Sequence, residues 1–179
     1  MRRYTLLMAL ALITVAVAIA GATTGPDTGG GGIDAKAAFA QLKQLEGVWE
    51  APAAGGKTAR TEFELTANGT VLIERYTNAA LPGGGKMATA YHLDGNDLVL
   101  THYCIANNQP VLRAEGFDAA TREIQFEFLR AGNLPSPAAG HMHRASYRIV
   151  DADHFVTEWD FFENGAKKMT EKETFTRIK

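Results

Sequence analysis

The chain has 179 residues, of which 46% are hydrophobic and 21% are charged, and its formal net charge is −2. This length is sufficient for one domain with a substantial core, and the near balance of charges excludes the basic surface that nucleic-acid binding needs. A single cysteine, Cys104, excludes an internal disulfide, so packing alone must stabilise the fold.

The N-terminal segment has the pattern of a secretory signal peptide. Two arginines, at positions 2 and 3, precede an apolar run over residues 6–20, and residues 20–22 are the small residues that signal peptidase requires. The apolar run is shorter than the about 20 residues of a membrane span. We therefore expect residues 1–22 to be removed, which leaves a periplasmic or secreted chain that is not inserted in the membrane. An uncleaved N-terminal anchor is the alternative.

A flexible tether and a short helix are expected next. Residues 23–33 include a run of four glycines at 29–32 and lack side chains that could pack. Asp34 is suited to cap an amphipathic helix that contains Leu42 and ends at Gly47.

Beyond the helix, apolar residues alternate with a period of two, which indicates β-strands. Turns rich in Gly, Asn and Asp separate most of them. The predicted strands are 48–51, 60–66, 70–77, 87–93, 97–105, 111–117, 123–130, 141–150, 154–162 and 168–178. A long meander of this kind closes into a barrel, because closure removes exposed strand edges. The sequence therefore predicts an all-β fold, a single antiparallel up-and-down β-barrel of about 8–10 strands over residues 34–179, with a short N-terminal helix.

Strand alternation also predicts which side chains point into the barrel. His102 shares a face with Cys104 and two leucines. His141 and His143 share a face with Tyr147, whereas Met142 lies with two arginines on the opposite face. Because arginines favour water, we expect both histidines to point inward.

The predicted interior therefore contains an unusual cluster of imidazole and thiol groups. Residues two apart on a strand lie about 7 Å from each other on one face, so their side chains can converge on one ligand or metal. Imidazole and thiolate suit zinc or copper. The candidate ligand-binding residues are His102, Cys104, His141, His143, Tyr147 and Trp159, and the candidate metal ligands are His102 and His143. The alternative is that His141 and His143 lie at the barrel rim and that Cys104 is a small buried hydrophobic residue.

The first predicted strand opens in a way that resembles lipocalin-like, or calycin, barrels. Gly47-Val48-Trp49 follows the short helix, as the Gly-x-Trp motif does in that class. Residues 39–178 further resemble a group of uncharacterised secreted bacterial proteins with such a barrel, through the segments 101–104, 108–110, 141–143 and 151–154 and through Trp159. The resemblance implies a barrel whose closed end is plugged by Trp49, and export of the protein, but no activity. Haem-binding calycins open with a longer Gly-Trp-Gly pattern, so haem is not expected here.

Three functions are compatible with these features. The first is an exported barrel that binds a small, mostly apolar ligand in its cavity, because barrels of this size enclose cavities. The second is a metal-binding protein or enzyme that uses the His/Cys cluster. The third is an envelope interaction module whose barrel is filled by its own side chains. No catalytic residue is assigned, and binding is favoured over catalysis.

Overall fold

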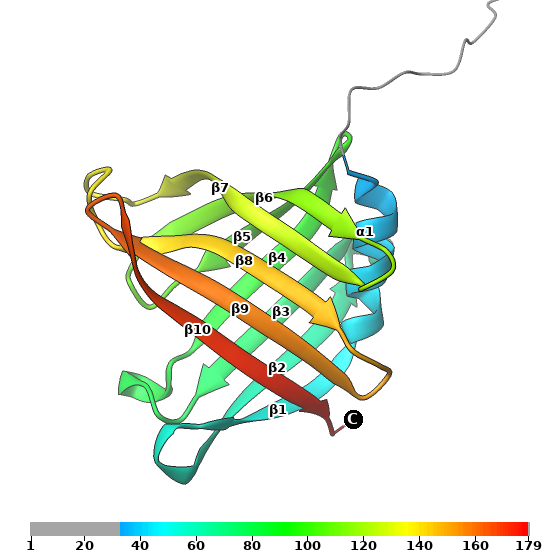
Figure 1. Ribbon diagram of the computed structural model, residues 1–179, viewed down its shortest axis with the longest axis horizontal. Helices are drawn as coiled ribbons and strands as arrows, with labels where there is room; N and C mark the ends of the chain where they lie inside the picture. The colour runs from blue at the N-terminus through cyan, green and yellow to red at the C-terminus, as the bar shows by residue number, and fades with distance from the viewer. Residues whose placement is uncertain (1–32, 179) are drawn as a thin grey trace, which may run out of the picture. The chain divides into compact units, whose positions relative to one another are not determined.

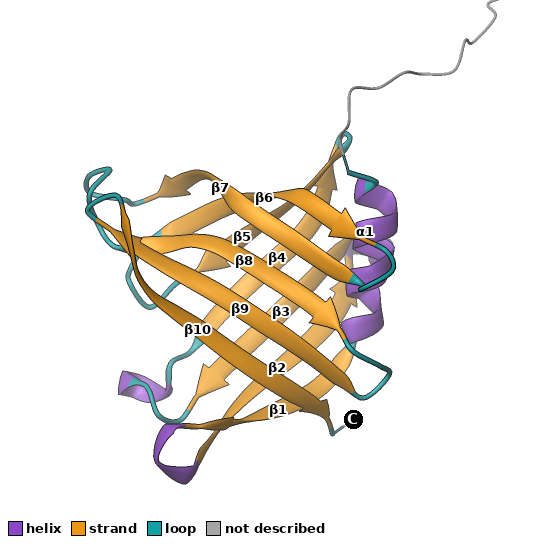
Figure 2. Cartoon of the chain, viewed as in Figure 1, coloured by secondary structure: helices purple, strands orange, loops and turns teal. Residues whose placement is uncertain are grey.

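The computed structural model describes residues 33–178, which form one helix, several single-turn 3₁₀ helices and ten strands (Figures 1 and 2). The predicted signal peptide and all but the last residue of the tether lie outside the described residues. The helix is α1 (Ala35–Leu42), followed by a 3₁₀ turn, η1 (Lys43–Leu45). The strands are β1 (Gly47–Ala53), β2 (Lys57–Thr66), β3 (Val71–Asn78), β4 (Met87–Asp94), β5 (Asp97–Tyr103), β6 (Gln109–Asp118), β7 (Glu123–Gly132), β8 (His141–Ile149), β9 (His154–Glu163) and β10 (Ala166–Arg177).

The ten strands form one closed antiparallel barrel. Each strand pairs with its neighbours in the sequence, and β1 pairs with β10 to close the sheet. This confirms the predicted up-and-down barrel with its short N-terminal helix, a lipocalin-like fold. The predicted strand boundaries agree with the observed ones to within a few residues. The reason is that the Gly, Asn and Asp residues between the strands indicate where most turns lie.

The β2–β3 turn illustrates this local control. Asn68 has a φ of 56° and Gly69 a φ of 77°, both in the left-handed region. Asn and Gly adopt this region at low cost, which is why the Asn-Gly pair marks the turn.

Helix α1 begins at the predicted cap and covers one end of the barrel (Figure 1). The Asp34 carboxylate accepts a hydrogen bond from the Ala37 amide at 2.9 Å, which satisfies a free N–H of the first turn. Ala38 and Leu42 on the inner face of the helix are fully buried. No helix within residues 33–178 has the length and apolar character that crossing a membrane requires.

Trp49 lies at this covered end and is fully buried, as expected for the Gly-x-Trp motif. Its indole Nε1 donates a hydrogen bond to the Leu45 carbonyl at 2.7 Å, so its one polar atom is satisfied. Phe155 meets the ring edge-on at a centroid distance of 4.8 Å, and the Arg177 guanidinium lies 3.9 Å from the ring centre.

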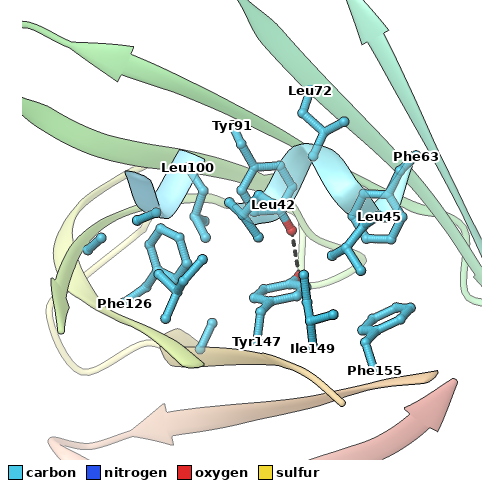
Figure 3. Close-up of a cluster of buried hydrophobic side chains, with 14 of the residues drawn as sticks. Leu42, Leu45, Phe63, Leu72, Tyr91, Leu100, Phe126, Tyr147, Ile149 and Phe155 are labelled. Atoms are coloured by element: carbon cyan, nitrogen blue, oxygen red, sulfur yellow. Dashed lines mark hydrogen bonds between the residues drawn. The ribbon is translucent and has the colours of Figure 1, made fainter. Parts of the chain in front are cut away.

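Side chains fill the half of the barrel next to α1 (Figure 3). The labelled members of this cluster are Leu42, Leu45, Phe63, Leu72, Tyr91, Leu100, Phe126, Tyr147, Ile149 and Phe155. A ligand cavity can therefore lie only in the other half of the interior.

Candidate functional site

A narrow pocket occupies the barrel interior beyond the filled half. Leu72 belongs to the core cluster and does not line the pocket, whereas Glu74 and Tyr76, further along β3, line it, and Tyr76 is also a member of the cluster. The lining residues come from six strands and are Glu74, Tyr76, Met87, Thr89, His102, Met142, Thr157, Trp159, Glu171, Glu173 and Phe175. Its free volume is about 30 Å³, which is room for one or two water molecules.

Apolar and acidic side chains share the wall of this pocket. Met87, Met142, Trp159 and Phe175 supply its apolar surface. Its ionisable groups are three glutamates, one histidine and the phenol of Tyr76, and no lysine or arginine belongs to the lining. The pocket therefore combines an apolar wall with a negative charge balance.

His102 is the polar group in this wall that lacks a complete set of partners. Its side chain is only 5% exposed, and its ring packs against Trp159 at a centroid distance of 4.8 Å. Its Nδ1 lies 3.0 Å from the Thr89 hydroxyl, whereas its Nε2 has no hydrogen-bond partner among the described residues. Burial lowers the pKa of His102 to about 4, so the ring is neutral at pH 7.

Glu171 and Glu173 lie on the same face of β10, two residues apart. Tyr76 donates a hydrogen bond from its hydroxyl to Glu173 Oε1 at 2.8 Å, and Asn78 in turn donates to the Tyr76 oxygen at 3.0 Å. Burial raises the pKa of Glu173 to about 7, and the neighbouring Glu171 charge adds to this effect. Within residues 33–178, neither carboxylate forms an ion pair with a lysine or arginine.

Glu74 lies at the junction between the pocket and the filled core, and three hydroxyl groups surround it. Oε1 accepts from the Thr61 hydroxyl at 2.9 Å. Oε2 accepts from the Tyr91 hydroxyl at 2.6 Å and from the Tyr147 hydroxyl at 3.0 Å. The two tyrosine oxygens are themselves 2.5 Å apart, a contact that Figure 3 shows as a dashed line.

The contacts around Glu74 favour its protonated form. Glu74 Oε2 and the oxygens of Tyr91 and Tyr147 form a triangle with three short contacts, but the two tyrosines supply only two protons. A proton on the carboxyl group completes the third hydrogen bond. Burial also raises the pKa of Glu74, in the direction this geometry requires.

The structure brings together three of the residues predicted for the site. His102 and Trp159 line the pocket and touch each other. Tyr147 is fully buried beneath them, and its ring meets Trp159 edge-on at a centroid distance of 6.2 Å. Its hydroxyl is engaged with Glu74, so Tyr147 supports the floor of the pocket and does not line it.

Strand alternation assigned the wrong face to Met142. This residue lines the interior pocket, whereas its neighbours His141 and His143 line a second pocket. The cause is an irregularity in the β8–β9 pairing between Met142 and Arg144, which shifts the alternation by one residue.

The second pocket has a volume of about 530 Å³ and lies where β7 and β8 separate. Their pairing ends at Glu127 and Arg144, so the residues beyond this point lie at the rim of the barrel. The His143 ring stacks between Phe128, at a centroid distance of 5.0 Å, and Phe162, at 4.3 Å. Burial lowers the pKa of His143. This location matches the rim alternative for the two histidines.

A hydrogen-bond relay fixes the roles of the ring nitrogens in this pair. His141 Nδ1 lies 2.8 Å from the Ala139 carbonyl, which can only accept, so Nδ1 carries a proton. In the tautomer with its single proton on Nδ1, His141 Nε2 accepts from His143 Nδ1 at 3.0 Å. The relay satisfies three of the four ring nitrogens locally.

Cys104 lies in the turn between β5 and β6 and lines neither pocket. Its amide donates to the Asn108 carbonyl at 3.1 Å. Burial raises the pKa of the Cys104 thiol, which disfavours the thiolate that metal binding and nucleophilic attack require.

The structure does not assemble the proposed metal site from His102 and His143, because the two residues line different pockets. In the described part of the chain, no three His, Cys, Asp or Glu side chains are grouped so that they could hold a metal ion.

Sequence reasoning missed the acidic residues of the site. Glu74 alternates with the apolar Leu72 and Tyr76, and Glu173 precedes the buried Phe175 by two residues. An acidic residue two positions from a core residue on a strand lies on the same, inward face, so both glutamates could have been predicted to be buried.

Comparison of the chain with protein-family models and with curated proteins finds no match.

Proposed function

We propose that this protein is an exported, lipocalin-like barrel that binds a small, mostly apolar molecule in its interior pocket. The observation that carries the proposal is the unpartnered Nε2 of His102, a buried atom in the wall of the pocket beside Trp159. A buried polar atom without a partner costs about 1–3 kcal/mol. A ligand that offers a polar group to this atom, and apolar surface to Trp159, would recover that cost.

The size of the pocket limits what can enter it. Its present volume accommodates a small group and no extended hydrocarbon chain. Met87 and Met142 form part of the wall, and methionine side chains change shape easily because they are unbranched. We therefore propose that one end of the ligand enters the pocket and that these two methionines move to admit it.

Methionine methyl resonances provide a direct test on the unmodified protein. Outside the predicted signal peptide the chain has three methionines, of which Met87 and Met142 line the pocket and Met169 is 51% exposed on β10. Hexan-1-ol, hexylamine and hexanoate would be titrated separately into protein labelled at the methionine methyl carbons. We expect at least one of them to shift the Met87 and Met142 signals in a saturable way and to leave Met169 unchanged.

Two outcomes would contradict the proposal. The first is the absence of any saturable shift with all three probes. The second is a parallel drift of all three methionine signals, which would indicate non-specific association with the surface. Assignment by Met87→Leu and Met142→Leu identifies the signals, and Leu is close enough in volume to preserve the wall.

A further inference from the structure

We infer that the polar end of the ligand is a cation, an ammonium group attached to a small apolar body. This inference rests on the proposed function and names the chemical class that the interior pocket selects.

The first support is the charge of the lining. Glu74, Glu171 and Glu173 are its three acids, and it contains no lysine or arginine. Glu74 is held in its own hydroxyl network, which leaves the pair on β10 as the groups that face a ligand. An anionic ligand would have to approach these two carboxylates without a compensating positive charge.

The second support is the location of the nearest cation along the strand. Lys172 stands between the two acids in the sequence, but its Nζ contacts Glu158 at 2.5 Å, and 59% of its side chain is exposed. Strand alternation places Lys172 on the outer face and both acids on the inner face. The chain therefore neutralises Glu158 on its surface and leaves its two interior carboxylates without a cation among the described residues.

The third support is His102, which is 95% buried and has an Nε2 without a partner. In the tautomer in which Nδ1 donates to the Thr89 hydroxyl, Nε2 is a hydrogen-bond acceptor. An ammonium group carries three donors, which matches one imidazole nitrogen and two carboxylates. The Trp159 ring, in contact with His102, adds a surface that attracts cations.

The protonation of Glu173 gives this recognition a pH dependence. Its pKa of about 7 is raised by burial and by the neighbouring acids, so the group loses its proton between about pH 6 and pH 8. His102 remains neutral throughout this range because burial lowers its pKa to about 4. Burial also raises the pKa values of Glu171 and Glu74, so any deprotonation of these acids adds to the effect of Glu173 in the same direction, and the pKa of Tyr76 is raised from an ordinary value already above this range. A cation should therefore bind more tightly at pH 8 than at pH 6.

The three six-carbon probes isolate the contribution of the head group. Hexylamine is cationic at both pH values, because a primary amine titrates near 10.4, whereas hexan-1-ol is neutral and hexanoate is anionic. At pH 8 we expect hexylamine to bind about tenfold or more tightly than hexan-1-ol, in keeping with the greater strength of charge-assisted hydrogen bonds. Its affinity should fall severalfold at pH 6, while that of hexan-1-ol should stay constant.

Substitutions at the acids make the test specific. Glu173→Gln should reduce hexylamine affinity about tenfold, weaken its dependence on pH and leave hexan-1-ol binding unchanged. Glu171→Gln is a second variant of the same kind in case the first does not fold. Glu158→Gln is the matched control, because this acid lies on the outer face, where Lys172 contacts it, and the variant should bind hexylamine as the wild type does.

Failure of this inference is distinguishable from failure of the proposed function. Two results would overturn the inference and leave the proposed function standing. One is that hexan-1-ol or hexanoate binds as tightly as hexylamine, and the other is that Glu173→Gln and Glu171→Gln leave hexylamine binding intact. In either case the barrel binds a small molecule but does not recognise it as a cation. If none of the three probes gives saturable shifts, both are overturned.

Discussion

At the scale of single residues, the pocket is defined by groups whose burial has altered their acid–base chemistry. Burial disfavours the charged form of each group, so it lowers the pKa of His102 and raises that of Glu173. The two shifts have opposite consequences for stability as a function of pH.

Glu173 should make the folded protein less stable as the pH rises. Its folded pKa of about 7 exceeds the ordinary value of 4.5, so between these values the folded state holds a proton that the unfolded state has released. The free energy of unfolding therefore decreases from pH 4.5 to pH 7 on account of this group. We expect Glu173→Gln to remove that part of the dependence, measured by urea unfolding at several pH values.

His102 changes the free energy of unfolding with pH in the opposite direction, so its contribution must be separated from that of Glu173. Between about pH 4 and pH 6.5 the unfolded chain binds a proton at His102 that the folded chain does not, so this group stabilises the fold as the pH rises. The difference between wild type and Glu173→Gln at each pH cancels the His102 contribution. A difference that stays constant from pH 4.5 to pH 7 would show that Glu173 titrates normally in the folded protein.

At the scale of secondary-structure elements, helix α1 and the start of β1 close one end of the barrel. Ala38 and Leu42 of the helix and Trp49 of β1 are fully buried in one cluster. The bond from the Trp49 indole to the Leu45 carbonyl ties the strand to the turn after the helix. Trp49 is therefore the residue that connects helix α1 and the turn after it to the sheet.

Replacing Trp49 with alanine should reduce the free energy of unfolding by about 3–5 kcal/mol, the usual cost of removing a large buried aromatic side chain. The substitution removes the contacts with Phe155 and Arg177 as well as the hydrogen bond. Trp159→Ala is a suitable comparison, because Trp159 is partly exposed at the pocket and should cost less. Equal losses for the two variants in chemical denaturation would contradict the role assigned to Trp49.

Most elements of this fold could be predicted from the sequence because turn residues and the period-two pattern act locally. Asp34 as a helix cap and Asn68-Gly69 as a turn are examples in which one or two residues determine the backbone. Met142 shows where this reasoning fails, because the irregularity beside it depends on the pairing of two strands and has no signature in either one.

The candidate site was predicted less completely than the fold. His102 and Trp159 followed from alternation, since β5 and β9 are regular up to those positions. The expectation that His143 joins His102 required the relative height of two strands that are not adjacent in the barrel, which the sequence does not contain.

At the scale of the whole barrel, one half of the interior is a packed core and the other half contains the pocket. Closure of β1 on β10 leaves no strand edge in the sheet, and the half next to α1 is packed with side chains. Stability can therefore come from the filled half, while the other half can keep an unpartnered histidine and two uncompensated acids. Such a division suits a binding protein, because a poorly satisfied pocket is tolerated when the rest of the core is well packed.

Export of this barrel is a prediction that can be tested at the level of the whole chain. The two arginines, the apolar run over residues 6–20 and the small residues at 20–22 predict cleavage after residue 22. Cleavage after residue 22 would leave the helix and every strand of the barrel intact, because α1 begins after its cap at Asp34 and all ten strands follow it. The cleaved chain would have 16 basic and 20 acidic residues, a net charge of −4.

N-terminal sequencing of the protein recovered from the periplasm or the medium should begin at or near Thr23. A variant in which Ala20 and Ala22 are both replaced by a bulky residue such as Phe should accumulate uncleaved, because signal peptidase requires small side chains at these positions. Replacement of Ala37 and Ala40, which lie beyond the cut and outside the buried core, is the comparison that should leave processing unchanged. Recovery of the wild-type chain with Met1 intact in the membrane fraction would contradict cleavage and would favour the uncleaved anchor.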